Sequence, residues 1–237
     1  MFQNLKVYKC GKFYRIISIK LKTNNQIIAK SQKSLNDKKL KNNIIRAKNN
    51  IQNYALSNNF KYFITITINQ KFDRYNLQIL RLNFRSIIRQ INRKYNLSVK
   101  YLIVPEQHKN GAWHFHGFLT EDIQQVIYYN QYGYKSIKEL ENLGFHNIDE
   151  VRSIEKCSNY VTKYISKNLG ENIEISKHCY FASQGLLKPQ LVEDIIYNNE
   201  YFNNKFFEFK NDFCYVKTIP EDEYYNFVTL LKNSCNF

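Results

Sequence analysis

Residues 101–119 read YLIVPEQHKNGAWHFHGFL, and this stretch decides the fold. Two apolar, β-prone runs flank a Lys-Asn-Gly segment, which predicts a β-hairpin. Because side chains alternate along a strand, His114 and His116 share one face of the second strand, and Phe115 lies on the other. Two imidazoles side by side on a rigid strand supply half of a metal site.

The length of the turn decides whether Glu106 joins the two histidines. A two-residue turn would pair Glu106 with Phe115 and point the carboxylate away from both rings. A three-residue loop, Lys109-Asn110-Gly111, places Glu106 opposite His114 on the same face. We favour this register, because Gly111 sits where the loop needs a left-handed residue. An acidic group on an apolar strand also needs a partner.

Two further segments carry patterns that bear on function. Residues 63–67 read FITIT, within a strand predicted over 61–68, and we interpret the two threonines as structural because threonine is favoured in strands. Residues 160–167 read YVTKYISK, within a helix predicted over 156–168. Tyr160 and Tyr164 therefore lie one turn apart on the same helix face.

These three segments together resemble the HUH endonucleases, the metal-dependent rolling-circle replication initiators of plasmids and single-stranded DNA phages. The His-x-His strand with Glu106 eight residues upstream is similar to the central motif of that family. Residues 63–67 resemble its first motif, and residues 160–167 its third, the tyrosine-lysine helix. The likeness covers roughly residues 45–190. A His-x-His pair alone is weak evidence, whereas three motifs in order are specific.

The resemblance implies a divalent metal ion, Mn²⁺ or Mg²⁺, held by His114, His116 and Glu106, and mixed nitrogen and oxygen donors suit such ions. It implies that Tyr160 is the nucleophile, which leaves a 5′-phosphotyrosine and a free 3′-OH that primes a host DNA polymerase. The bond energy stays in that linkage, so joining needs no ATP. Tyr164 is either a second nucleophile or a packing residue.

Two lysines follow the tyrosines in the third motif. The reference pKa of tyrosine, about 10, is too high for ready attack at neutral pH, so the phenol needs help. Lys163 would lower the pKa of the phenol or contact phosphate. Lys167 would bind DNA.

The clearest predicted helix spans residues 76–94. Its apolar stripe is built by Leu77, Leu80, Phe84, Ile87, Ile88 and Ile91. Arg81, Arg85 and Arg89 form a ridge that turns away from the stripe, and it is either a DNA-binding surface or an ordinary solvated face. The tyrosines of residues 128–134 either stack on unpaired bases or pack in the core.

The positive charge is concentrated near the N-terminus. Residues 1–61 hold 14 lysines and arginines against one acidic residue, out of a net charge of +15 for the chain. Such a block is typical of a nucleic-acid partner, because neutralised phosphates release counterions; a flexible solubilising arm is the alternative. Residues 188–237 are acidic, with 8 acidic residues and 5 lysines.

We predict an α+β fold with a central antiparallel sheet, flanking helices and ferredoxin-like topology. The predicted domains are a basic extension at 1–45, an endonuclease domain at 46–190 and an acidic, aromatic extension at 191–237. Outside the motifs we expect a hairpin within 1–30 that closes near residues 23–25, a helix that begins after residue 30, a strand at 144–153, and helices near 191–201 and 221–233.

The predicted function is metal-dependent nicking and joining of single-stranded DNA at an origin hairpin, which initiates rolling-circle replication of a phage or plasmid. A host polymerase and a host helicase are the expected partners, because no helicase-type phosphate loop occurs in the sequence. Two alternatives are a cupin-type metalloenzyme, since Glu121 follows the His pair, and a protein that binds a DNA hairpin without cutting it.

The sequence also bears on the cellular compartment. Its five cysteines are scattered and lack a Cys-x-x-Cys pair, which is typical of a reducing compartment rather than a disulfide framework. It has neither a membrane-spanning apolar run nor a signal-peptide pattern. We therefore expect a cytoplasmic protein, in the host cell if a phage encodes it, with no membrane partner.

Overall fold

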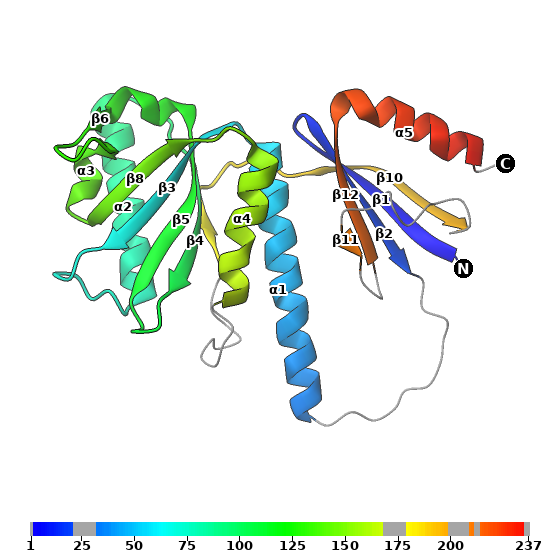
Figure 1. The fold of residues 1–237 in the computed structure, drawn as a ribbon, viewed down its shortest axis with the longest axis horizontal. Coiled ribbons are helices and arrows are strands. Elements are labelled where there is room, and N and C mark those ends of the chain that lie inside the picture. Colours follow the sequence, from blue (N-terminus) through cyan, green and yellow to red (C-terminus); the bar gives the residue numbers. More distant parts are fainter. Residues whose placement is uncertain (1, 21–31, 168–178, 199–208, 211–213, 235–237) are drawn as a thin grey trace. The chain divides into compact units, whose positions relative to one another are not determined.

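The structure is a computed structural model that describes residues 2–20, 32–167, 179–198, 209–210 and 214–234. The chain folds into two compact units (Figure 1). One unit is formed by Lys33–Leu186, and the other combines Met1–Gln32 with Leu187–Phe237. The boundaries differ from those predicted, because the two chain ends build one unit together instead of two separate extensions.

The larger unit contains a five-stranded antiparallel sheet in the order β8-β3-β5-β4-β9. Its strands are β3 (Phe60–Ile68), β4 (Tyr101–Gln107), β5 (Trp113–Thr120), β8 (Gly144–Glu150) and β9 (Phe181–Ala182). β5 pairs antiparallel with both β3 and β4, so those two strands run parallel to each other and the helix between them crosses the sheet. This is the split βαβ arrangement of a ferredoxin-like fold, and the predicted α+β class is confirmed.

One face of this sheet is covered by α2 (Leu77–Tyr95) (Figure 1). The helix begins at Asn76, whose side chain accepts a hydrogen bond from the Ile79 N–H, as is usual at a helix N-cap. Its buried residues are Leu80, Phe84, Ile88 and Ile91. They pack in one cluster with Phe115 and Leu119 of β5, so the predicted apolar stripe is confirmed.

The opposite face carries α1 (Gln32–Ser57) and α4 (Ile154–Lys167), which lie side by side in Figure 1. Ile51 and Ala55 of α1 pack with Val161 and Ile165 of α4 and with Phe118 of β5. Since α4 packs closely on β4, the helix with the two tyrosines lies next to the strand with Glu106.

The β4–β5 hairpin has the three-residue loop that the sequence favours. Gly111 has a positive φ of 83°, and its N–H donates to the His108 carbonyl oxygen at 2.8 Å. The register pairs Glu106 with His114, as predicted. Further along β5, a Cβ atom on Gly117 would lie 2.1 Å from the Leu102 carbonyl oxygen, so glycine at this position allows β4 to approach.

Small elements link β5 to α4. They are a 3₁₀ helix η1 (Glu121–Val126), a two-stranded sheet of β6 (Ile127–Tyr129) and β7 (Lys135–Ile137), and a short helix α3 (Lys138–Glu141). His146 of β8 ties them to the main sheet, because its Nε2 accepts from the Ile137 N–H at 2.9 Å. The segment predicted as helical or irregular, with four tyrosines, is thus largely a hairpin.

The smaller unit is a second antiparallel sheet in the order β10-β1-β2-β12-β11. Its elements are β1 (Phe2–Cys10), β2 (Phe13–Lys20), β10 (Gln190–Asn198), β11 (Phe209–Lys210), β12 (Cys214–Pro220) and α5 (Glu221–Ser234). Its core contains Leu5, Ile16 and Phe227, with the rings of Tyr14 and Tyr224 stacked at 3.6 Å. The basic N-terminal end thus pairs with the acidic C-terminal end, through Lys6–Asp194 at 3.2 Å and Lys9–Glu221 at 2.7 Å.

Three sequence-based expectations differ from the structure. The N-terminal hairpin turns at Gly11-Lys12, whereas residues 23–25 lie outside the described residues. The predicted helix near 191–201 is strand β10 over its described part, because β1 offers an open edge and Val192, Ile195 and Ile196 favour strands. The cupin alternative requires a jelly roll, and a sheet with helices on both faces is a different architecture.

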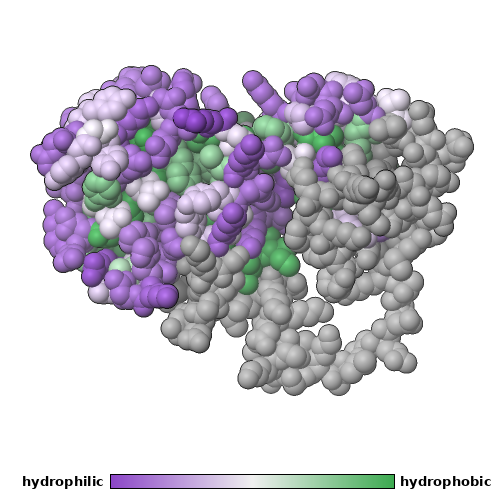
Figure 2. All heavy atoms as spheres, viewed as in Figure 1, coloured by the Kyte–Doolittle hydropathy of each residue, from purple (hydrophilic) through white to green (hydrophobic). Residues whose placement is uncertain are grey.

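The surface of the described residues is mostly hydrophilic on the face that Figure 2 shows, with apolar residues in small patches. None of the helices in the described ranges combines the length and the apolarity needed to cross a membrane.

Candidate active site

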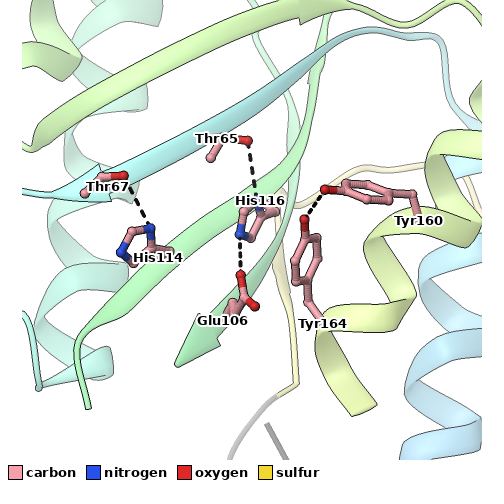
Figure 3. Close-up of polar contacts among 7 residues, drawn as sticks. All are labelled: Thr65, Thr67, Glu106, His114, His116, Tyr160 and Tyr164. Atoms are coloured by element: carbon pink, nitrogen blue, oxygen red, sulfur yellow. Dashed lines mark hydrogen bonds and ion pairs between the residues drawn. The ribbon is translucent and has the colours of Figure 1, made fainter. Parts of the chain in front are cut away.

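The candidate site lies on the sheet face that carries α4, where two rows of side chains cross neighbouring strands. The first row joins Glu106 of β4, His114 of β5 and Thr67 of β3. The second row places His116 next to Thr65. Figure 3 shows these five side chains together with Tyr160 and Tyr164 of α4.

Each histidine contacts a threonine of β3 through its Nδ1 atom. Thr65 Oγ1 lies 3.4 Å from His116 Nδ1, and Thr67 Oγ1 lies 3.3 Å from His114 Nδ1. These contacts leave the Nε2 atoms to face other partners. The sequence interpretation of the threonines as purely structural missed this contact, although their two-residue spacing matches that of the histidines.

Glu106 and His116 form a close, largely buried pair. His116 Nε2 lies 2.9 Å from Glu106 Oε2. The imidazole can donate this hydrogen bond while its Nδ1 accepts one from Thr65, since a threonine hydroxyl both donates and accepts. Glu106 thus contacts His116 diagonally, while the residue opposite it in the register is His114.

His114 has a different neighbour, His108, which the sequence analysis did not select. The two rings stack with centroids 3.7 Å apart. Burial, followed by the nearby His108 and His116, lowers the pKa of His114 to about 4. His114 is therefore neutral at pH 7, which is the form that binds metals.

Donor chemistry at this site suits a divalent ion, because two imidazoles and one carboxylate share one face. The three side chains do not converge in the structure, and no group of three His, Cys, Asp or Glu among the described residues is arranged to hold a metal ion. The donor set therefore fits in kind, and His114 would have to turn towards the Glu106–His116 pair to complete it.

Tyr160 and Tyr164 meet this site from α4 with different exposure. Tyr160 is 48% exposed, whereas Tyr164 is 7% exposed. The Tyr164 ring stacks on His116, with centroids 4.0 Å apart, and its hydroxyl donates a hydrogen bond to the Tyr160 hydroxyl (Figure 3). Burial and this hydrogen bond raise the pKa of Tyr164 above its ordinary value.

The other predicted site residues lie away from this cluster or outside what can be described. Lys163 is exposed on α4, and the side chain of Lys167 lies outside the described residues. Phe115 points to the face opposite the histidines, and it packs against Phe84 of α2 with ring centroids 6.1 Å apart. The α2 arginines therefore lie on the far side of the sheet.

On that far side, a pocket of about 350 Å³ lies between α2 and the β4–β9 edge of the sheet. Its lining includes Arg81, Arg85, Arg89, Lys100, Ser183 and Gln184. None of the four cations forms an ion pair within the described ranges. The pocket therefore has the chemistry of an anion site.

Comparison with known proteins places a family likeness over the same region. No curated protein and no solved structure matches the chain. Residues 61–169 match the model of a family described as replication-associated proteins. The matched segment runs from β3 through α4, and it contains every residue of the candidate site. In this segment the chain is similar to replication-associated proteins.

Proposed function

We propose that the chain nicks and rejoins single-stranded DNA at a replication origin and so initiates rolling-circle replication of a phage or plasmid. The observation that carries the proposal is the meeting of two strand-borne histidines and Glu106 with an exposed tyrosine on α4. The match of residues 61–169 to a replication-associated family supports the same conclusion.

Tyr160 is the proposed nucleophile, because it is the more exposed of the two tyrosines at the site. Its phenolic oxygen forms a bond to phosphorus as the bond from phosphorus to the 3′ oxygen breaks. The 3′ oxygen leaves and takes up a proton, so the products are a 5′-phosphotyrosine and a free 3′-OH. The reverse reaction restores the DNA strand without ATP.

Tyr164 supports Tyr160 in this proposal. It is packed between His116 and Tyr160, and its hydroxyl donates to the Tyr160 oxygen. A hydrogen bond to the charged form of a group favours that form, so Tyr164 would stabilise the Tyr160 phenolate. The buried position of Tyr164 favours this role over that of a second nucleophile.

Glu106, His114 and His116 would hold a divalent ion, Mn²⁺ or Mg²⁺. Such an ion, when bound, supplies charge neutralisation and Lewis-acid polarisation at the scissile phosphate. The chain's own contribution is to keep His114 neutral and to hold both imidazoles from their Nδ1 side through Thr65 and Thr67.

The arginine pocket on the far side of the sheet would bind the DNA backbone. Arg81, Arg85 and Arg89 line one hollow together with Lys100, and arginine is well suited to phosphate. We assign to this surface the duplex stem of an origin hairpin. A host polymerase and a host helicase would then extend and unwind the nicked strand.

The test is to incubate end-labelled single-stranded DNA from the replicon with the protein and Mn²⁺, and to follow cleavage by denaturing electrophoresis. Tyr160→Phe should abolish cleavage and leave DNA binding unchanged, and His114→Ala should abolish cleavage as well. Tyr225→Phe, at an exposed position of the smaller unit, is the matched control. Binding without cleavage by the unchanged protein would favour the hairpin-binding alternative and overturn the proposal.

A further inference from the structure

Exposed aromatic side chains gather beside the candidate active site. Phe145 of β8 is 53% exposed, and Tyr132 of the β6–β7 loop is 69% exposed. Tyr129 and Tyr134 of the same hairpin are exposed as well. Aromatic residues grouped on a protein surface mark a binding site more often than single exposed ones do.

Phe145 continues the row of active-site side chains across the sheet. Thr67 pairs with His114 on one side and with Phe145 on the other. Directly opposed residues of antiparallel strands lie on the same face, so Phe145 and His114 share a face. One strand separates theirs (Figure 1), which places the two residues about 10 Å apart.

A hollow of about 470 Å³ opens between this phenylalanine and the β6–β7 hairpin. We call it the aromatic hollow; its lining includes Tyr128, Tyr129, Asn130, Gln131, Tyr132 and Phe145. The loop over it is fixed, because Asn130 Oδ1 accepts hydrogen bonds from the backbone N–H groups of Tyr132 and Tyr134. The Tyr134 ring meets Phe145 edge to face at 5.7 Å.

The charges around the aromatic hollow are balanced. Lys138 pairs with Glu141 at 2.8 Å, and Lys135 with Glu150 at 2.7 Å. Both of these lysines are already neutralised, in contrast to the cations of the arginine pocket, so a phosphate gains little here. Aromatic faces and amide side chains instead suit the flat face and polar edge of a nucleobase.

We infer that the aromatic hollow holds an unpaired base of the DNA strand, close to the phosphate that is cut at the histidine site. This inference rests on the proposed function for the identity of the strand. It assigns to Phe145 and Tyr132 the stacking of that base, and it gives the enzyme a reason to prefer single-stranded over duplex DNA.

The test measures the binding of a fluorescently labelled oligothymidine by anisotropy, in a Tyr160→Phe background so that cleavage plays no part. Tyr132→Ala and Phe145→Ala should each weaken binding by about 5- to 100-fold, the range for losing one base–aromatic stack. Phe145→Trp should retain binding. The affinity for a blunt duplex should stay the same in all variants.

The matched control is Tyr225→Ala, which removes a 71% exposed tyrosine from α5 of the smaller unit and should change nothing. Tyr132 lies in an exposed loop, so its removal tests the inference even if Phe145→Ala disturbs the sheet. Unchanged single-strand affinity in Tyr132→Ala and Phe145→Ala would overturn the inference, as would failure of the parent protein to bind the oligothymidine. Weakened binding together with a wild-type chain that never cuts DNA would keep the aromatic hollow and reject the nicking function.

Discussion

At the scale of single residues, the two threonines of β3 explain how the histidines are held. A metal-binding imidazole usually donates its second N–H to a fixed partner, which sets the ring orientation. Thr65 and Thr67 occupy that place on the Nδ1 side of His116 and His114. A hydroxyl accepts from a protonated Nδ1 and donates to an unprotonated one, so it supports both tautomers.

Thr65→Val keeps the shape of the side chain and removes the hydroxyl. We expect the affinity for Mn²⁺, measured by calorimetry, to fall by about 10- to 100-fold, because the His116 ring loses its fixed orientation. Thr65→Ser keeps the hydroxyl and should retain the affinity. Equal Mn²⁺ affinities in the valine and serine variants would show that the contact is irrelevant.

His146 is a buried residue whose role is structural. Burial lowers its pKa, and its Nε2 accepts the Ile137 N–H. The folded protein therefore keeps His146 neutral at a pH where the unfolded chain binds a proton. Its contribution to the free energy of unfolding is complete above the unfolded pKa of about 6.5 and is lost as the pH falls towards the lower folded pKa.

His146→Gln should lower the free energy of unfolding by about 1–3 kcal/mol at pH 7.5, because the buried Ile137 N–H loses its acceptor. The difference between wild type and variant should shrink at pH 5, since only the wild type loses the histidine contribution. Urea unfolding at both pH values checks this. A difference that stays constant with pH would contradict the assignment.

At the scale of elements, local patterns predict the larger unit well. The alternation of residues 101–119 and the position of Gly111 gave the correct hairpin register, and the stripe from Leu80 to Ile91 gave α2. The sequence misplaced β10, because its strand conformation depends on pairing with β1 at the other end of the chain. It also missed His108, because stacking on His114 depends on how the turn folds back.

The α2 arginines lead to a prediction about salt dependence. Replacing Arg81, Arg85 and Arg89 by glutamine should weaken binding to a DNA hairpin. It should also reduce the slope of log K against log salt by about 2–3, since each lost phosphate contact contributes roughly 0.7–0.9. Arg93→Gln is the control on the same helix, because Arg93 does not line the arginine pocket. A slope that is unchanged in the triple variant would remove α2 from the DNA-binding surface.

At the scale of the whole molecule, the two units divide the work. The candidate site, the arginine pocket and the aromatic hollow all belong to Lys33–Leu186. Charge along the sequence suggested a free basic arm, yet Lys6 and Lys9 form ion pairs with the acidic C-terminal end. Charge counted along the chain could not reveal this pairing, since it depends on contacts between the two ends.

A fragment of residues 33–186 should therefore fold and cut single-stranded DNA at a rate close to that of the full chain. It retains both faces of the sheet and the two clusters of apolar residues that cover them. Circular dichroism and the cleavage assay check the two parts of this prediction. A folded fragment that binds DNA without cutting it would mean that the smaller unit contributes to catalysis.

The most direct test of the central claim is mass spectrometry of the protein after reaction with single-stranded DNA and Mn²⁺. The account predicts a covalent nucleotide adduct on Tyr160 that is absent in His114→Ala and in the presence of EDTA, and no adduct on Tyr164. Cleaved DNA without any tyrosine adduct, or an adduct on Tyr164 in place of Tyr160, would contradict it.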